Sequence, residues 1–330
     1  DAEDQNVIKC GSYVGNGSST GPEINLGWEP SFIILKNAEK SENWLMWDSM
    51  RGIVTGGDDA RLFPNLSTAE SNSENFLNLT PTGFQINNDG GDLNENNDTI
   101  IYLAIRRPDG YCGKPPELGT DVFNVDVAES DTNKPVFDSN FPVDFAFLRR
   151  PAVSEGWWTS ARLMQGKYFA TNTTGAEAAW SGMKFEYNDG WMSDTSYNNP
   201  YMSWQWKRHA GFDCIAYKGD GVSGRQIPHS LNKTVEMMWV KSRDSSGDDA
   251  AWQVYHKGLG PDDNDPEGWN LYLNTNQAQN WNNFGRWNKT VPTSTHFTLG
   301  NYDGVNKDGD DYIAMLFASV DGISKVGYYT

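Results

Sequence analysis

Three tryptophans in the last third of the sequence are the residues whose type and setting best fit ligand binding. Trp269, Trp281 and Trp287 fall in a polar stretch, residues 267–287, that also holds six asparagines. A tryptophan face beside asparagine and arginine donors suits a sugar, which is apolar on one side and hydrogen-bonding at its edge. The same rings could pack inside the domain, since tryptophan is usually mostly buried. We expect a contact surface here, and the exposure of the rings decides between the two interpretations.

Residues that could carry catalysis form no recognisable motif. The histidines His209, His229, His256 and His296 show no metal-ligand spacing, and neither H-E-x-x-H nor G-x-S-x-G occurs. A glycosidase is defined by two carboxylates about 5–10 Å apart in space, so the acidic residues neither supply nor exclude such a pair. The sequence predicts a non-enzymatic protein without a catalytic residue, a metal or a cofactor.

Acidic stretches at residues 87–92, 262–265 and 303–311 could offer oxygen ligands to calcium. Counting twelve residues from Asp303 reaches Ala314, where an EF-hand loop needs a glutamate. Asn, Asp and Gly are also the usual residues of exposed turns, because they tolerate positive φ. We expect solvated hairpin tips at all three places.

Internal repeats must position these residues. A Gly-Asn-Gly turn at residues 15–17 recurs as Gly-Asp-Gly at 219–221, a separation of 204 residues. The strands that follow end in Lys36 and Lys241, 205 residues apart. Two landmarks with nearly the same separation predict two periods of about 102 residues, and therefore a third copy between them.

The middle copy keeps the strands but lacks the glycine turn. Residues 141–150 match the Lys36 strand, including its basic end, and each copy closes on a strand near Tyr102, Tyr201 or Tyr312. The runs are short, β-branched or aromatic, and bounded by Gly, Pro, Asn and Asp. The sequence predicts an all-β protein of three tandem sandwiches, at residues 1–112, 113–213 and 214–330.

An aromatic strand follows the basic strand in every copy. Trp44, Trp157 and Trp252 occupy the same place in the three copies. Alignment at one strand position predicts a tryptophan that fills the core of each module.

Three cysteines lie near the starts of the copies. Cys10 and Cys214 match, and Cys112 follows Gly-Tyr much as Cys214 follows Gly-Phe-Asp. Equivalent positions in separate sandwiches should be far apart, whereas a disulfide needs Cα atoms within about 7 Å. We expect three buried free thiols, with no disulfide among them.

These landmarks together resemble a repeated module of marine bacteriophage structural proteins, of the concanavalin-like and laminin-G-like kind found in cyanophage-type fibres and adhesins. The resemblance rests on Tyr13 to Gly17, Trp28 to Lys36, Trp44 to Gly52, Ala69-Glu70, Gly83-Phe84 and Tyr102-Leu-Ala. It covers most of the chain, with the first copy matching best and the second most divergent. It implies jelly-roll sandwiches and a place in the virion, in a fibre, tail or capsid decoration, and it brings no catalytic residues.

Composition excludes several classes of partner. The net charge of −18 argues against nucleic acid, because phosphate binding needs a basic surface. No apolar run approaches the roughly 20 residues of a membrane span, and a signal segment is absent or already removed. The closing residues 326–330 are similar to the start of another turn strand, so we expect either a fragment of a longer chain or a disordered end.

Three functions remain open from the sequence. The first is a virion structural, fibre or adhesin protein at the virion surface or outside the cell, contacting other virion proteins, a host glycan or further copies of itself. The second is a secreted carbohydrate-binding protein of cellular origin, which predicts glycans on the seven N-x-[ST] sequons. The third is a polysaccharide-degrading enzyme, which predicts a cleft with two close carboxylates.

Overall fold

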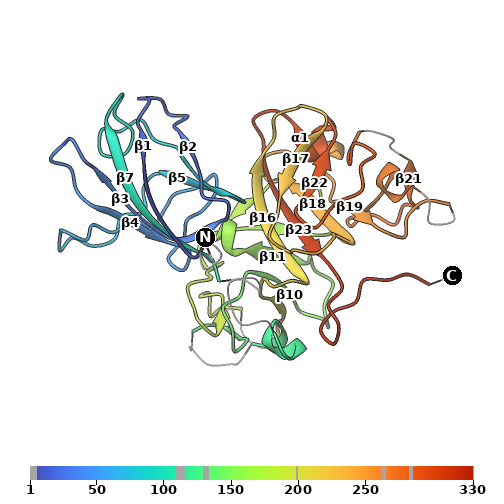
Figure 1. The fold of residues 1–330 in the computed structure, drawn as a ribbon. Coiled ribbons are helices and arrows are strands. Elements are labelled where there is room, and N and C mark those ends of the chain that lie inside the picture. Colours follow the sequence, from blue (N-terminus) through green and yellow to red (C-terminus); the bar gives the residue numbers. More distant parts are fainter. Residues whose placement is uncertain are drawn as a thin grey trace. The chain divides into compact units, whose positions relative to one another are not determined.

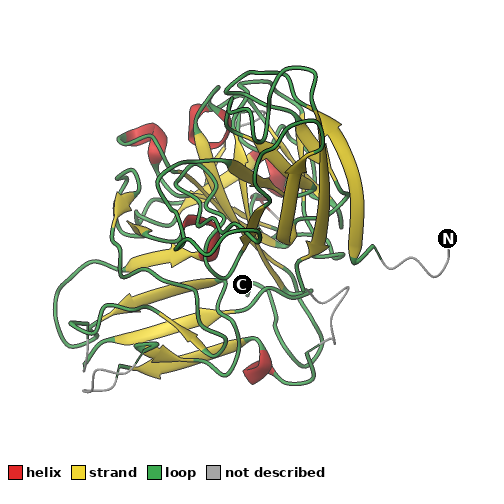
Figure 2. Cartoon of the chain, turned by 90° about the vertical axis from the view of Figure 1, so that its left-hand side faces the viewer, coloured by secondary structure: helices red, strands yellow, loops and turns green. Residues whose placement is uncertain are grey.

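The computed structural model describes residues 6–108, 116–128, 134–197, 200–261, 265–281 and 285–329. Strands make up 37% of the chain and helices 5%, so the all-β prediction is confirmed (Figure 2). Among these residues, no helix has both the length and the apolar character to cross a membrane. The chain divides into two compact units, one of residues 1–108 with 162–164 and one of residues 109–161 with 165–330.

The first unit consists of two antiparallel sheets (Figure 1). Its four-stranded sheet has the order β1 (Ile8–Val14), β7 (Thr99–Arg106), β3 (Pro30–Asn37), β4 (Leu45–Asp48). Its three-stranded sheet has the order β2 (Glu23–Asn25), β6 (Gly83–Ile86), β5 (Leu77–Thr80). The rings of Phe84 and Tyr102, one from each sheet, meet edge to face at 5.9 Å. Side chains alternate between the faces of a strand, so one face of each sheet forms this core.

The second unit begins with a six-stranded sheet. Its order is β13 (Ala178–Ala179), β12 (Lys167–Ala170), β11 (Trp158–Ala161), β10 (Phe145–Arg149), β15 (Met202–Trp206), β8 (Phe123–Val127). A two-stranded ribbon of β14 (Gly190–Trp191) and β9 (Phe137–Asp138) packs against it. The buried Trp191 donates its indole N–H to Ser203 Oγ at 2.9 Å, which joins the ribbon to the sheet.

A second six-stranded sheet completes this unit. Its order is β16 (Phe212–Lys218), β23 (Asp311–Phe317), β18 (Met237–Ser242), β19 (Gln253–His256), β20 (Trp269–Tyr272), β21 (Asn280–Trp281). It packs against the ribbon of β17 (Arg225–Pro228) and β22 (His296–Leu299). Helical turns are short: η1 (Gly119–Asp121), η2 (Arg162–Met164), η3 (Asp248–Ala250), η5 (Pro266–Gly268) and α1 (Asp303–Asn306).

One strand order occurs three times along the chain. In each case the first strand of a stretch lies beside its last strand, and two strands from the middle of the stretch follow. The three orders are β1-β7-β3-β4, β8-β15-β10-β11 and β16-β23-β18-β19. We call these stretches the first, second and third repeats. The predicted limits at residues 112 and 213 stay predictions: the first lies outside the described residues, and β16 already begins at Phe212.

The glycine turns are anchored in the same way in the first and third repeats. Asn94 is fully buried, and its side chain accepts from the Asn16 N–H and donates to the Ser18 carbonyl at 2.7 Å. Asn306, also fully buried, accepts from the Asp220 N–H and donates to the Val222 carbonyl at 3.0 Å.

Both glycines of each turn are required by this anchoring. A Cβ on Gly15 or Gly219 would lie 2.1 or 2.0 Å from a backbone carbonyl of the anchoring segment. Gly17 and Gly221 have φ of +64° and +67°, a conformation that favours glycine. The Gly-x-Gly pattern therefore marks a close backbone approach followed by a left-handed residue.

Strand register places the basic and aromatic landmarks at equivalent positions. Leu35 pairs with Leu45, Val240 with Gln253, and Leu148 with Trp158. In each pair, the next residue after the first-named member is basic: Lys36, Lys241 or Arg149. The residue just before the second-named member is a tryptophan: Trp44, Trp252 or Trp157. All six belong to the sheet face turned away from the core of their own repeat.

The expectation that the aligned tryptophans fill the module cores is wrong. Trp44 is 39% exposed and Trp157 is partly exposed, whereas Trp252 is fully buried. Trp252 is covered because the outer face of its sheet packs against the second repeat. On the opposite face of β4, Trp47 is fully buried in the core of the first repeat, where Trp28 is buried as well.

Two of the cysteines also lie on the outer faces of the sheets, so their exposure differs between the first and third repeats. Cys10 and Cys214 are free thiols, as expected, but Cys10 is exposed and only Cys214 is buried. Cys112 lies outside the described residues. By register, Val125 of β8 holds the position of Cys10 and Cys214, because it pairs with Trp204 as Cys10 pairs with Leu103 and Cys214 with Met315.

The two six-stranded sheets pack against each other by their outer faces. The ring of Phe147 in β10 lies 5.9 Å from that of Trp239 in β18. The ring of Phe169 in β12 meets Trp252 edge to face at 5.6 Å, and the indole N–H of Trp252 donates to the Ala170 carbonyl at 3.3 Å. The second and third repeats therefore share a continuous aromatic interface.

Buried charges also lie at this interface. Arg243 Nε and Glu177 Oε2 are 2.7 Å apart, with both side chains nearly covered. Lys241 is fully buried, with its ammonium 5.2 Å from the Phe169 ring and donating to the Ser242 carbonyl at 2.8 Å. Burial lowers the pKa of Lys241 from 10.5 to about 8.

Candidate functional site

An exposed tryptophan hairpin stands at the edge of the third repeat. Trp269 of β20 pairs with Trp281 of β21, and their rings are 5.3 Å apart at 64°. Trp281 is 44% exposed, while Trp269 is partly covered. A Cβ on Gly268 would lie 2.2 Å from the Trp281 ring, so the glycine lets this ring lie against the backbone. The result is one open ring held by a second ring and a glycine.

Polar groups surround the open ring. Lys289 Nζ lies 5.7 Å from the centre of the Trp281 ring and 3.7 Å from Asp265 Oδ2. Asn280, the other residue of β21, is exposed. An apolar ring with a nearby cation, a carboxylate and an amide can stack on a sugar face and bond its hydroxyls at the edge.

Trp287 does not belong to this surface. It is 1% exposed, and its ring packs edge to face on Tyr255 in the core of the third repeat. Its indole N–H donates to the Trp269 carbonyl at 3.1 Å. The structure thus separates the three predicted residues: Trp281 is open, Trp269 supports it, and Trp287 is a core residue that holds the strand beneath. Trp287 was misassigned because a polar sequence surrounds it while its own side chain points inward.

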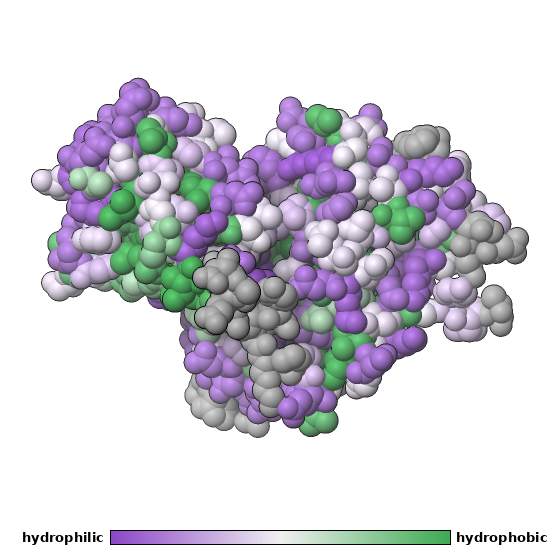
Figure 3. All heavy atoms as spheres, in the orientation of Figure 1, coloured by the Kyte–Doolittle hydropathy of each residue, from purple (hydrophilic) through white to green (hydrophobic). Residues whose placement is uncertain are grey.

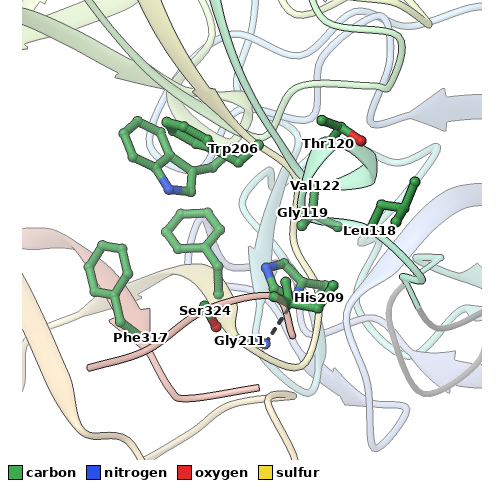
Figure 4. A pocket seen from close by; sticks show the side chains of 12 residues that line it. Leu118, Gly119, Thr120, Val122, Trp206, His209, Gly211, Phe317 and Ser324 are labelled. Atoms are coloured by element: carbon green, nitrogen blue, oxygen red, sulfur yellow. Dashed lines mark hydrogen bonds between the residues drawn. The ribbon is translucent and has the colours of Figure 1, made fainter. Parts of the chain in front are cut away.

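A pocket of about 690 Å³ lies at one end of the interface between the second and third repeats (Figure 4). Its walls come from β8 and the turn before it, the ends of β15, β16 and β23, and residues 323–324. The apolar side chains of the lining are Leu118, Val122, Phe123, Trp206, Phe212, Phe317 and Ile323. Among the described residues of the lining, His209 is the one titratable side chain, and the largely apolar wall suits an apolar group.

The described part of the chain places no group of three or more His, Cys, Asp or Glu side chains where they could hold a metal ion.

A family model described as "Domain of unknown function (DUF7483)" matches residues 2–107 and 164–330. The chain belongs to this family. The stretch outside the DUF7483 match, residues 108–163, contains β8 to β11 and so the first half of the second repeat. The break therefore falls in the repeat whose sequence diverges most. A comparison with curated proteins finds no match.

His209 shapes the wall of the pocket in this DUF7483 chain. His209 and Phe212 exchange backbone hydrogen bonds of 2.8 and 3.1 Å, and His209 Nδ1 accepts the N–H of Gly211 at 3.1 Å. Nδ1 can accept only when the ring is neutral. Burial, with a smaller contribution from Lys207, lowers the pKa of His209 from 6.5 to about 4.

We expect acid to weaken the second unit through His209. Between pH 6.5 and 4 the unfolded chain binds a proton that the folded chain does not, so the free energy of unfolding falls as the pH falls. The difference in pKa corresponds to up to about 3 kcal/mol in the free energy of unfolding, and this contribution is lost once the pH has fallen to about 4. His209→Asn keeps an acceptor for Gly211 without a titrating group, so urea unfolding of the variant should show a smaller slope against pH in this range. An unchanged slope would contradict the assignment.

Sequence reasoning missed the pocket and the buried asparagines. The pocket residues come from four separate segments, and no spacing along the chain relates them. Asn94 and Asn306 of this DUF7483 chain lie 212 residues apart, not 204, because the loops before them differ in length. An apolar residue precedes each asparagine, Leu93 before Asn94 and Val305 before Asn306, and this pattern could have identified the two asparagines. The carbonyls of Leu93 and Val305 accept hydrogen bonds from the hydroxyls of Tyr13 and Tyr217.

Proposed function

We propose that the chain is a non-enzymatic structural, fibre or adhesin protein of the virion surface, built from three tandem jelly-roll sandwiches of the concanavalin or laminin-G type. The recurrence of one strand order in three successive stretches supports the modular part of this proposal. Repeated modules suit a protein that spans a distance and presents surfaces, since function on such scaffolds lies in edges and loops. Its partners would be other virion proteins and a host glycan.

The open Trp281 ring is the observation that carries the binding part. The ring is 44% exposed and packs against Trp269, so one of its faces is open to stack on a sugar. The ring lies on an edge ribbon, so a chain of sugars can approach it. Lys289 and Asp265, which pair at 3.7 Å beside it, can donate to and accept from hydroxyl groups. We propose that the third repeat stacks a glycan ring on Trp281.

Trp281→Ala should lower glycan affinity by about tenfold or more, which corresponds to about 1.4 kcal/mol of lost stacking. The probe is an array of bacterial surface oligosaccharides, followed by calorimetry with the best binder. Leu273→Ala, which removes another exposed apolar side chain near the same hairpin, is the matched control and should keep its affinity. Far-ultraviolet circular dichroism should match the unmodified chain for both variants.

Two results would count against this assignment. One is an array on which the unmodified chain binds nothing. The other is equal affinity of Trp281→Ala and Leu273→Ala for the same oligosaccharide, which would leave the third repeat as a spacer.

A further inference from the structure

The way the second and third repeats meet shows how the outer face of this module is covered. On the two packed sheets, the face consists of matching rows. Phe145, Phe147 and Arg149 in β10 correspond to Met237, Trp239 and Lys241 in β18, by the register derived above. Phe147 lies on Trp239 and Phe145 on Phe212, at ring distances of 5.9 and 5.8 Å. One repeat therefore buries its outer face against the outer face of another repeat.

The corresponding face of the first repeat is apolar as well. Its row in β3 is Phe32, Ile34 and Lys36, at the positions of Met237, Trp239 and Lys241. The row in β7 is Ile101, Leu103 and Ile105. The β1 row is Ile8, Cys10, Ser12 and Val14, and the row along β4 is Met46 and Asp48, with Trp44 just before the strand. We call this set the β3/β7 face. Ile101 is 41% exposed, Ile8 and Val14 more so, and Figure 3 shows apolar residues gathered over β3, β4 and β7.

The charges at the β3/β7 face are already satisfied within the repeat. Lys36 donates to the carbonyls of Asn37 and Lys40. Asp48 Oδ2 pairs with Arg51 Nε at 2.6 Å. A partner therefore needs to supply apolar surface and no particular charge.

We propose that two copies of this chain associate through their β3/β7 faces. The occupant is a second copy because, in the second unit, repeat covers repeat by this same face, while three repeats per chain leave one face over. When two identical faces pair about a twofold axis, each covers the other, so the assembly is a closed dimer and no β3/β7 face remains for a third copy.

The available area fits such a dimer. Four strands about 4.8 Å apart, with about seven residues of 3.4 Å each, present roughly 450 Å² in projection. Two such faces bury about 1,000 Å² once the relief of the side chains is included, which is at the lower end for a specific interface. The dimer should therefore be reversible and depend on concentration.

Sedimentation velocity of the full chain over a range of concentrations tests the proposal. The unmodified chain should shift from its 36.9 kDa mass toward twice that value as concentration rises. Ile101→Glu places a carboxylate in the β7 row of the face, where Ile101 is 41% exposed, and should keep the chain monomeric. Val222→Glu, the same kind of change at an exposed position of the second unit, should leave the dimer intact.

Salt gives a second readout. Each copy carries a net charge of −18, so the copies repel, and added salt should strengthen an apolar dimer by screening that repulsion. An association held by ion pairs would weaken instead.

The reactivity of Cys10 measures whether the β3/β7 face is covered, and it requires no substitution within that face. In a Cys112→Ser background, the exposed Cys10 should react with a thiol reagent more slowly as protein concentration rises, while the buried Cys214 stays unreactive. This measurement applies even if Ile101→Glu unfolds the first unit. A chain that is monomeric at every concentration overturns the proposal. So does a dimer that persists in folded Ile101→Glu, or in which Cys10 keeps its full reactivity.

Discussion

Trp252→Ala is expected to lower the free energy of unfolding of the second unit by about 3–5 kcal/mol, as is usual for a large buried aromatic side chain. The ring is fully buried against Phe169, and its N–H bonds to Ala170 of the second repeat. Alanine removes packing from both repeats at once and takes away one donor to that carbonyl, which still accepts from Thr173. Urea unfolding, followed by tryptophan fluorescence and circular dichroism, measures the loss.

Trp44→Ala is the matched control, because the register puts Trp44 at the equivalent position of the first repeat. Its ring is 39% exposed, so in dilute protein the loss should be below about 1 kcal/mol. Equal losses for the two variants would show that packing between the second and third repeats does not set the stability of the unit.

Lys241→Met is expected to stabilise the second unit at pH 7. Burial lowers the pKa of Lys241 to about 8, so below that pH the folded chain carries the full cost of a buried ammonium. The shift from 10.5 corresponds to about 3 kcal/mol. Methionine avoids this cost but loses the hydrogen bond to the Ser242 carbonyl, worth about 1 kcal/mol, which leaves a net gain of about 2 kcal/mol.

The sign of the pH dependence follows from the same shift. Between pH 8 and 10.5 the unfolded chain binds more protons than the folded chain, so stability of the unmodified chain should rise with pH there. Lys241→Met should lack that rise. Lys36→Met, at the equivalent and partly exposed position, is the control and should change stability little. A destabilised Lys241→Met would mean that the ammonium makes contacts that outweigh its burial.

Much of the fold could be predicted because turn residues and alternating strand patterns mark each repeat in the sequence. The Gly-x-Gly turns and the basic-ended strands gave the period, and strand register aligns Lys36, Arg149 and Lys241 as the sequence comparison did. Those positions depend on local backbone geometry, which a short pattern of residues specifies well.

The tryptophans could not be assigned from the sequence, because burial depends on what covers a face. Trp44 and Trp252 share a strand position, yet one is open and the other is covered by a neighbouring repeat. Trp287 points inward from a polar segment, and Trp281, six residues earlier, points outward. The pocket needs strand ends from two repeats, so no single segment contains a sign of it.

The turn that links β15 to β16 has a consequence for affinity. Five residues, 207–211, join the last strand of the second repeat to the first strand of the third. A connection this short holds the two outer faces at a very high effective concentration, in the millimolar range or above. A face pair that associates only weakly between separate chains can then be almost always closed within one chain. The same apolar surface can thus serve as a permanent seam in one part of the molecule and as a reversible, concentration-dependent contact in another.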